Sequence, residues 1–218
     1  MKNIVSLKKE YVSVGSSFGG NQNLFGETKE PFSKGKQLGG CGVVAISDTV
    51  SYLKGDLHFN TGSDYRRNFN KTARRILFIP TRFGMTFFQE LLGMKHISFR
   101  ESLGLKCRLV SFKRDFYPLI HDMLKDDIPV ILCIPRIYGR NKSARSLPFY
   151  DPVTLKKVTQ TQGHFVVATG IFIEGNDVYL EISSWGKRYF IKFEEFKVFV
   201  KKHPASRLGF MMKITRRR

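Results

Sequence analysis

A cysteine with the setting of a nucleophile stands at position 41, in the segment GGCG that covers residues 39–42. Attack on a carbonyl carbon needs a thiolate, and the amino end of a helix favours a thiolate through its dipole and its unpaired amide groups. The glycines leave the backbone around Cys41 open, so a substrate carbonyl could accept a hydrogen bond from the Cys41 amide, which would supply half of an oxyanion hole. The alternative interpretation is a small residue at the start of a buried helix.

His164 is the second residue with the setting for this chemistry. It follows a glycine and starts the segment HFVVATGIFI (164–173), which has the character of a strand, so its ring can protrude from a sheet edge into a cleft. An imidazole there would accept the thiol proton, hold the resulting ion pair and later protonate the leaving group. Cys107 and Cys133 lie in strand-like segments, and we expect them in the core. No catalytic role is expected for the remaining histidines, His58, His96, His121 and His203.

The elements that carry these two residues predict an α+β fold with a helical first half. From Gly42 to Lys54 apolar residues recur at three- and four-residue spacing, which places Cys41 at the amino end of a helix that Gly55 stops. Further helices are expected within residues 64–79, 83–94, 97–105, 116–127 and 193–203. Strands are expected within 105–112, 128–135, 164–173, 177–185 and 187–193, with a last edge strand within 207–215. Short links between the later strands imply antiparallel neighbours.

The length and composition fit one globular domain that spans residues 1–218. The chain is 42% hydrophobic and 25% charged, as in folded soluble proteins. Residues 1–40 show no sustained periodicity and are interpreted as a loop-rich segment over the body of the domain. Residues 136–163 are polar and basic, and a loop of this length inside a compact domain is usually functional or disordered. Because this loop ends at His164, we interpret it as a candidate lid.

The charge balance favours an anionic partner. Lys and Arg number 37 against 18 Asp and Glu, a net charge of +19, which would attract nucleic acid, an anionic membrane surface or an acidic protein. Three cysteines without a C-x-x-C spacing predict free thiols, and no metal or cofactor is expected. No apolar run reaches the roughly 20 residues of a membrane span, and the charged residues 8–10 stand where a signal peptide would be apolar. A cytoplasmic location is therefore expected, with secretion that needs no cleaved signal left open.

The motifs together resemble the papain-like cysteine peptidase superfamily. They are the Cys-Gly at a helix start, the later Gly-His followed by Val-Val and a glycine, and VYLEISSWGKRYFIKFEEF (178–196). Within the superfamily, the chain is most similar to bacterial proteins that resemble the double-glycine leader-processing peptidases of bacteriocin exporters. The resemblance implies a papain-like fold, in which the nucleophile helix packs on a C-terminal antiparallel sheet. It also implies that Cys41 and His164 are catalytic.

The third catalytic position departs from the family pattern. Papain relatives often read Asn-Ser-Trp-Gly and the leader-processing type reads Asp-Pro, whereas residues 183–186 read Ser-Ser-Trp-Gly, so the resemblance places Ser183 where the residue that orients the histidine is expected. A serine brings one hydrogen bond and no charge, so it would stabilise an imidazolium less. Glu181, two residues back on the same strand face, is the alternative third residue. In the resemblance Trp185 shields the histidine and its partner from water, and a core tryptophan is the alternative interpretation.

The second oxyanion donor also departs from the pattern. In the family it is a glutamine, usually six residues before the cysteine, but position 35 is a glycine. Gln37, four residues before Cys41, is the candidate, with a spacing that differs by two residues. Asn21 or Gln22 in the preceding loop could fold back instead.

The function expected from these residues is that of a thiol hydrolase, most simply a cysteine peptidase with a peptide or protein substrate. The Cys41 thiolate would attack an amide carbonyl, His164 would protonate the departing amine, and water would release the acyl group. A deamidase or acyltransferase could use the same dyad, because only the acceptor of the acyl group differs. The hypothesis from another class is a non-catalytic papain-like binding protein that holds an anionic partner on its basic surface.

Overall fold

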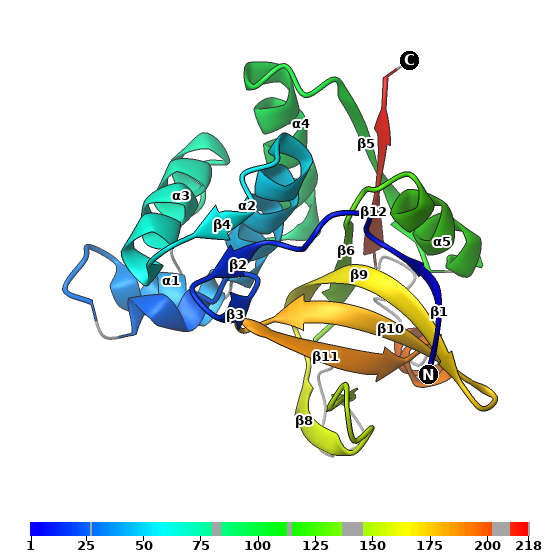
Figure 1. The fold of residues 1–218 in the computed structure, drawn as a ribbon. Coiled ribbons are helices and arrows are strands. Elements are labelled where there is room, and N and C mark those ends of the chain that lie inside the picture. The colour runs from blue at the N-terminus through cyan, green and yellow to red at the C-terminus, as the bar shows by residue number, and fades with distance from the viewer. Residues whose placement is uncertain (27, 80–83, 113–114, 137–145, 202–209, 218) are drawn as a thin grey trace.

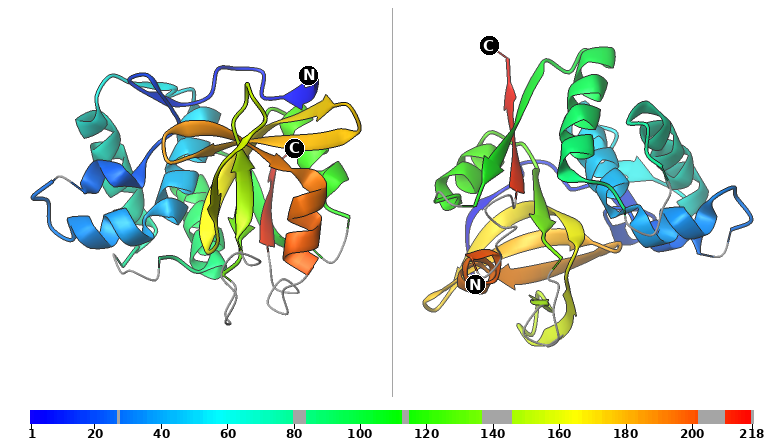
Figure 2. Two further views of the ribbon diagram at one scale, coloured as in Figure 1. Left: turned by 90° about the horizontal axis from the view of Figure 1, so that it is seen from below. Right: turned by 180° about the vertical axis from the view of Figure 1, so that it is seen from behind.

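The chain folds into an α+β structure in which helices and a large antiparallel sheet lie side by side (Figure 1). The computed structural model describes residues 1–26, 28–79, 84–112, 115–136, 146–201 and 210–217. Within them, the first half carries the helices α1 (Ser33–Gly39), α2 (Cys41–Lys54), α3 (Gly62–Arg75) and α4 (Phe87–Arg100). The second half adds α5 (Tyr117–Lys125) and α6 (Phe193–Lys201). The two further views place α1 to α4 at one side of the molecule and most strands at the other (Figure 2).

The main sheet holds nine strands among the described residues, and every pairing in it is antiparallel. Its order is β5 (Leu105–Ser111), β12 (Phe210–Arg216), β6 (Val130–Ile134), β9 (His164–Glu174), β10 (Asp177–Ser184), β11 (Lys187–Lys192), β7 (Leu147–Tyr150) and β8 (Lys157–Thr161). The strand β1 (Lys2–Ser6) pairs with β9. A small sheet joins β2 (Ser13–Val14), β3 (Ser17–Phe18) and β4 (His58–Phe59).

The helix α2 is the central element of the fold. It packs against β9 and also contacts α3, α4 and β6, so residues 41–43 and 45–52 are all buried. Gly55 ends it with a φ of 86°, the left-handed conformation that glycine adopts without strain at a helix end. The expected helix after Cys41 is therefore confirmed at both of its ends, and its burial against the sheet fixes where its first residue lies.

The caps of α3 and α4 explain where these two helices begin. Thr61 and Asp64 form a capping box at α3, and Thr86 and Gln89 form one at α4, so free amide groups of both first turns are satisfied. The expectation of a separate helix within residues 97–105 is wrong. The helix α4 runs on to Arg100, and β5 begins a few residues later.

Two segments interpreted as loops contain strands. Residues 1–40 hold β1, β2, β3, the short 3-10 helix η1 (Gln22–Phe25) and α1. The described part of 136–163 is largely a hairpin, because β7 and β8 pair with each other and β7 extends the main sheet beside β11. Residues 137–145 of the expected lid lie outside the described residues.

The last strand also differs from its expected place. β12 lies between β5 and β6 inside the sheet and pairs with β5 along its whole length, so the expectation of an edge strand is wrong. Among the described residues, no helix has the length and apolar character needed to cross a membrane.

Candidate active site

A small hollow lies where α2 meets the beginning of β9 and the end of β10. Cys41, Val44, Ala45 and Asp48 line it from α2, because residues three, four and seven apart share one helix face. The hollow holds about 10 Å³, close to the space that one water molecule needs. The site is therefore closed in this structure, and a substrate can enter only after side chains around it move.

Cys41 is the first residue of α2, and several backbone amides donate hydrogen bonds to its sulfur. Burial is the largest influence and raises the pKa of the thiol to about 11, and the nearby carboxyl of Glu90 acts in the same direction. Hydrogen bonds from the backbone amides of Phe165, Gly42 and Cys41 itself favour the thiolate but do not outweigh burial. The thiol is therefore neutral at pH 7 in the closed site, whereas the helix dipole alone led us to expect a thiolate.

His164 is the first residue of β9, lines the same hollow and is buried. Its Nε2 atom lies 2.8 Å from Ser184 Oγ, and its ring stacks on the indole of Trp185 with centroids 4.5 Å apart and planes inclined by 20°. Burial lowers the pKa of the imidazole to about 3. The structure thus brings a neutral thiol and a neutral imidazole to one hollow, and the expected resting ion pair does not form in it.

Neither residue expected to orient the histidine contacts it. Ser183 donates its hydroxyl to the carbonyl of Phe18 at 3.1 Å, although it also lines the hollow. Glu181 lies outside the hollow, where its carboxylate accepts a hydrogen bond from Thr169 Oγ1 at 2.8 Å and pairs with Arg188 at 3.4 Å.

The register of the sheet explains why Ser184 takes this place instead. Ser183 pairs with Val167 across β9 and β10, three residues beyond His164. Side chains alternate between the faces of a strand, so Ser184 shares the face of His164 and Ser183 does not. An irregularity in the ladder between Glu181 and Ile182 sets this alternation, and the motif alone does not reveal it.

The expected oxyanion donor Gln37 does not line the hollow. It lies in α1, where its backbone carbonyl accepts a hydrogen bond from Gln22 Nε2 at 2.9 Å and its side-chain amide lies against Gly26. Gln22 does line the hollow and is buried, while Asn21 caps η1 through its side chain. Of the alternatives open from the sequence, Gln22 is therefore the one that lines the same hollow as Cys41. Only one of the two N–H groups of its amide is used in this bond.

The segment that carries Gln22 is anchored by a buried carboxylate that the sequence analysis did not single out. Asp48, two turns along α2 from Cys41, accepts hydrogen bonds from the Gly20 amide at 2.8 Å and from the Tyr65 hydroxyl at 2.6 Å. Burial raises the pKa of Asp48 to about 6, although both of these bonds act against it. The apolar spacing around Asp48 predicts its helix but does not reveal its partners Gly20 and Tyr65, which come from other parts of the chain.

Glycine is required where this segment approaches β10. Gly19 has a φ of 78°, and a Cβ atom there would lie 2.0 Å from Ser183 Oγ. A Cβ atom at Gly20 would lie 1.8 Å from the Tyr65 hydroxyl. Pairing of Phe18 and Gly20 with Gly186 fixes the segment further, through two backbone hydrogen bonds of 3.0 Å. The two glycines therefore bring Gln22 to the site.

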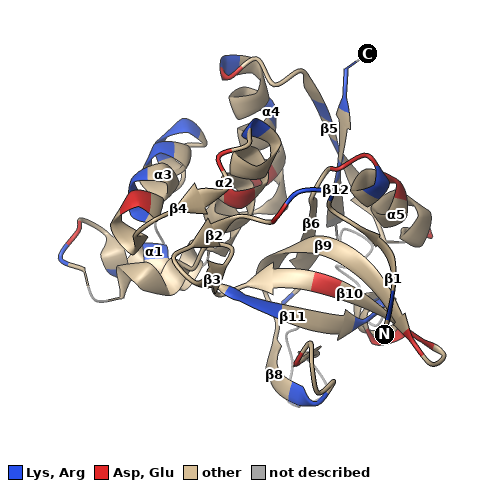
Figure 3. Cartoon of the chain, viewed as in Figure 1, with Lys and Arg blue, Asp and Glu red and all other residues tan. Residues whose placement is uncertain are grey.

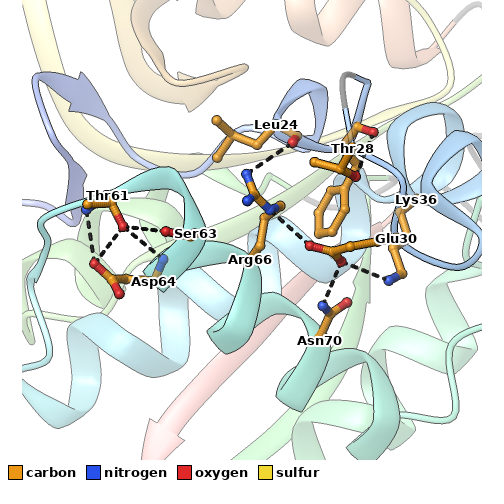
Figure 4. Close-up of polar contacts among 10 residues, drawn as sticks. Leu24, Thr28, Glu30, Lys36, Thr61, Ser63, Asp64, Arg66 and Asn70 are labelled. Atoms are coloured by element: carbon orange, nitrogen blue, oxygen red, sulfur yellow. Dashed lines mark hydrogen bonds and ion pairs between the residues drawn. The ribbon is translucent and has the colours of Figure 1, made fainter.

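A second anchor holds the following residues against α3 (Figure 4). Glu30 accepts hydrogen bonds from Arg66 and Asn70, both at 3.0 Å, and pairs with Lys36 at 3.4 Å. Burial alone would raise the pKa of Glu30, but the bonds from Asn70 and Arg66 and the charge of Lys36 outweigh it and lower the pKa. Arg66 also reaches the carbonyl of Leu24, so the α1 region is tied to the helical half of the molecule.

Glu90 is an unexpected buried acid behind the nucleophile. It lies on α4 and is fully buried, and neither carboxyl oxygen has a hydrogen-bond partner among the described residues. A Cβ atom built on Gly42 would lie 2.9 Å from Glu90 Oε1, so the carboxyl faces the first turn of α2. Burial raises the pKa of Glu90 well above its usual range.

The three cysteines are free thiols, as expected from their number and spacing. Cys107 is buried, and Cys133 is partly buried on β6, opposite Phe165 of β9. Burial raises the pKa of both thiols. Neither lines the hollow, so Cys41 is the nucleophile candidate that the geometry favours.

The chain was compared with known proteins in three ways, and none of the comparisons found a match. Neither protein-family models nor curated proteins nor solved structures match this chain.

Proposed function

We propose that this protein is a papain-like thiol hydrolase, most simply a cysteine peptidase. The observation that carries the proposal is that Cys41 and His164, more than a hundred residues apart, line one hollow. The residue after His164 donates its backbone N–H to the Cys41 sulfur. Nucleophile and base on adjacent elements, with a third group on the base, form the general arrangement of nucleophilic catalysis.

The reaction starts from a neutral pair. When Nε2–H of His164 is donated to Ser184 Oγ, the Nδ1 atom carries the lone pair. Nδ1 takes the thiol proton as the sulfur forms its bond to the substrate carbonyl carbon, and the C–N bond then breaks as the same proton passes to the departing amine. Water attacks the thioester, His164 again moves the proton, and a carboxylic acid leaves with the thiol restored.

The oxyanion formed in each step has two donors within reach. One is the Cys41 amide at the amino end of α2, and the other is the Gln22 side chain, which lines the same hollow. Loss of one such donor typically costs about 100- to 1,000-fold in rate. Trp185, stacked on His164, excludes water from the base and holds its ring in one orientation.

Substrate entry is expected to change the charge state of the pair. Burial is the largest cause both of the raised thiol pKa and of the lowered imidazole pKa. Opening of the hollow removes part of that burial, so the two pKa values approach each other and proton transfer from sulfur to nitrogen becomes easier. The closed hollow thus favours an inactive resting state that substrate binding relieves.

The acyl acceptor is the part of this proposal that the dyad does not determine. If water accepts the acyl group, the enzyme is a peptidase when the acyl donor is a peptide bond and a deamidase when the acyl donor is a glutamine side chain. An amine acceptor gives an acyltransferase. Peptide or protein substrates fit all three.

A non-catalytic binding protein is the second candidate, and one observation favours it. The hollow has space for about one water molecule and holds a neutral thiol and a neutral imidazole, as would be the case after loss of catalysis. The group that holds His164 is the hydroxyl of Ser184 and not an Asn or Asp side chain, which points in the same direction.

Incubation with a complex peptide mixture separates these candidates. Mass spectrometry of the products should show new amino termini for the wild type, and Cys41→Ala and His164→Ala should abolish them. Cys107→Ala, a buried thiol outside the hollow, is the matched control and should retain activity. Deamidated or amine-linked products in place of new termini assign the related chemistries. Absence of all products, with folded protein, supports the binding protein.

A further inference from the structure

The outer face of α4 is apolar and basic and carries no acidic residue. Phe88, Leu92 and Phe99 are 65%, 64% and 83% exposed, and their intervals of four and seven residues place them on one stripe of the helix. Lys95 lies within the same stripe, with His96 and Arg100 on its flank, all exposed. The opposite face of α4 is buried in the core, so the helix is well packed and the exposed stripe faces outward.

A groove continues the stripe past the last turns of α4. It holds about 630 Å³, and Lys95 and Phe99 line it from the helix. Lys106 of β5 and Arg217, beyond the end of β12, line the other side, where the Arg217 amide donates to the Gly104 carbonyl at 2.6 Å. Three cationic side chains therefore surround a concave surface that opens beside an exposed aromatic ring.

The surroundings leave this positive charge uncompensated. From residue 65 to residue 114 the sequence has only two acidic residues, Glu90 and Glu101. Glu90 is fully buried and does not reach the surface, and Glu101 pairs with Lys54 at 2.7 Å and with Arg75. Blue segments on α3, at the end of α4 and on β5 show the same excess of Lys and Arg (Figure 3).

We propose that the stripe and groove bind the surface of a membrane that contains anionic phospholipids. Phe88, Leu92 and Phe99 would enter the boundary between headgroups and acyl chains, which is the depth that apolar faces of interfacial helices reach. Lys95, Lys106 and Arg217 would bind lipid phosphates in the groove at the same time. The net charge of +19 strengthens the approach to such a surface.

The apolar residues decide between a membrane and the other anionic partners. The phosphates of a nucleic acid could bind the cationic side chains, but the exposed Phe88, Leu92 and Phe99 of the stripe would then have no apolar partner. Leu77 and Ile79, 81% and 67% exposed after α3, extend the apolar character, because the neighbouring Ile76 packs against Gly93 of α4. Apolar side chains that protrude from a convex helix, with phosphate-binding cations beside them, fit a lipid surface.

Vesicle flotation tests this proposal without reference to catalysis. The full chain is mixed with phosphatidylcholine vesicles that contain about one third phosphatidylglycerol, and with pure phosphatidylcholine vesicles, at physiological salt. The double variant F88S/F99S removes two apolar contacts, and K95E/K106E reverses two groove charges. The matched controls are V153S, an apolar residue that is 90% exposed outside the stripe, and K187E, an exposed lysine of β11.

We expect the wild type to bind to the anionic vesicles only. F88S/F99S should weaken the partition coefficient by at least about tenfold, and each reversed charge should weaken it about fivefold or more. Both controls should bind as the wild type does, and all variants should keep the same melting temperature. Failure of the wild type to float, equal loss in the controls, or binding to a short RNA that the variants lose while vesicle binding is unchanged would each overturn it. The surface is separate from the hollow, so the outcome is independent of the peptidase proposal.

Discussion

His164 Nε2 lies 2.8 Å from Ser184 Oγ, where β9 begins and β10 ends. The neighbouring Ser183 instead holds the carbonyl of Phe18. One serine thus positions the imidazole, and the next holds the amino-terminal segment. Two adjacent residues of the same type therefore have separable roles.

Substitution of each serine by alanine tests this division. Ser184→Ala should lower kcat about tenfold or more, because the imidazole loses the partner that sets its tautomer. Its free energy of unfolding should also fall by about 1 kcal/mol, because the buried imidazole loses a hydrogen bond, so kcat is the quantity that separates the two variants. Ser183→Ala should lower the free energy of unfolding by about 1 kcal/mol through the lost hydrogen bond and leave kcat closer to that of the wild type. Steady-state kinetics and urea denaturation of both variants measure the two effects, and the reverse pattern would contradict the assignment.

The close approach of Gly19 to β10 predicts a severe substitution. Gly19→Ala places a methyl group 2.0 Å from Ser183 Oγ at a φ of 78°, so the segment that carries Gln22 must move. We expect a loss of about 2 kcal/mol or more in the free energy of unfolding, and lower activity. Gly175→Ala is the control, since its φ of 58° is similar but no atom lies within 4 Å of the added methyl group. It should cost only about 1 kcal/mol, from backbone strain. Equal effects of the two variants in urea denaturation would argue against the packing of this segment.

The pH dependence of stability should contain two opposite contributions. The pKa of His164 falls from 6.5 to about 3 on folding, so the unfolded chain binds a proton that the folded chain does not, and stability falls as pH decreases from about 6 to 4. The pKa of Asp48 rises from 3.8 to about 6, so stability falls as pH increases over the same interval. In the wild type the two slopes largely cancel.

Single substitutions should reveal each slope. His164→Gln should gain stability relative to the wild type as pH falls from 6 to 4, by about 1 kcal/mol per pH unit, and Asp48→Asn should gain relative stability as pH rises over that interval. Urea denaturation at pH 4, 5, 6 and 7 measures both differences. Parallel profiles for the three proteins would mean that neither group is buried as the structure has it.

The buried Glu90 carboxyl predicts a stabilising substitution. Its oxygens have no hydrogen-bond partner among the described residues, so Glu90→Met exchanges a desolvated polar group for an apolar side chain of similar size. We expect the free energy of unfolding to rise by about 1 kcal/mol or more. Thermal and urea denaturation measure the gain, with Glu30→Met, which removes an ion-paired carboxylate, as the destabilising contrast. A loss of stability in Glu90→Met would show that this carboxyl has a partner in solution.

Local patterns predicted the elements whose apolar spacing is regular and whose ends are marked. The helix α2 has a three-to-four residue period and a glycine stop, and β9, β10 and β11 are apolar runs joined by short turns. No local pattern predicts the strand β8, because its sequence KVTQT is largely polar and much of it is exposed. The interior place of β12 depends on pairing with β5, about a hundred residues earlier, and no local pattern carries that information.

Some residues of the candidate site can likewise be predicted from local sequence patterns, and others cannot. Cys41 and His164 were predictable because each begins an element and is flanked by glycine. Ser184 was not, because the irregularity in the pairing of β9 with β10 decides which serine faces the imidazole. The sequence offers Gln22 only as one of several alternatives, because α1 lies between it and Cys41 in the chain. The contacts of Gly19, Gly20 and Asp48 bring it back to the hollow.

Covalent labelling of Cys41 by a peptide-based electrophile, such as a peptidyl vinyl sulfone, tests the dyad most directly. The Cys41 sulfur adds to the terminal vinyl carbon as His164 takes the thiol proton and passes it to the carbon beside the sulfone. Mass spectrometry should therefore find the adduct on Cys41 and not on Cys107 or Cys133. His164→Ala should slow the reaction by about 100-fold or more at pH 7. Adducts spread over all three thiols, or a Cys41 rate that does not depend on His164, would contradict the proposed chemistry.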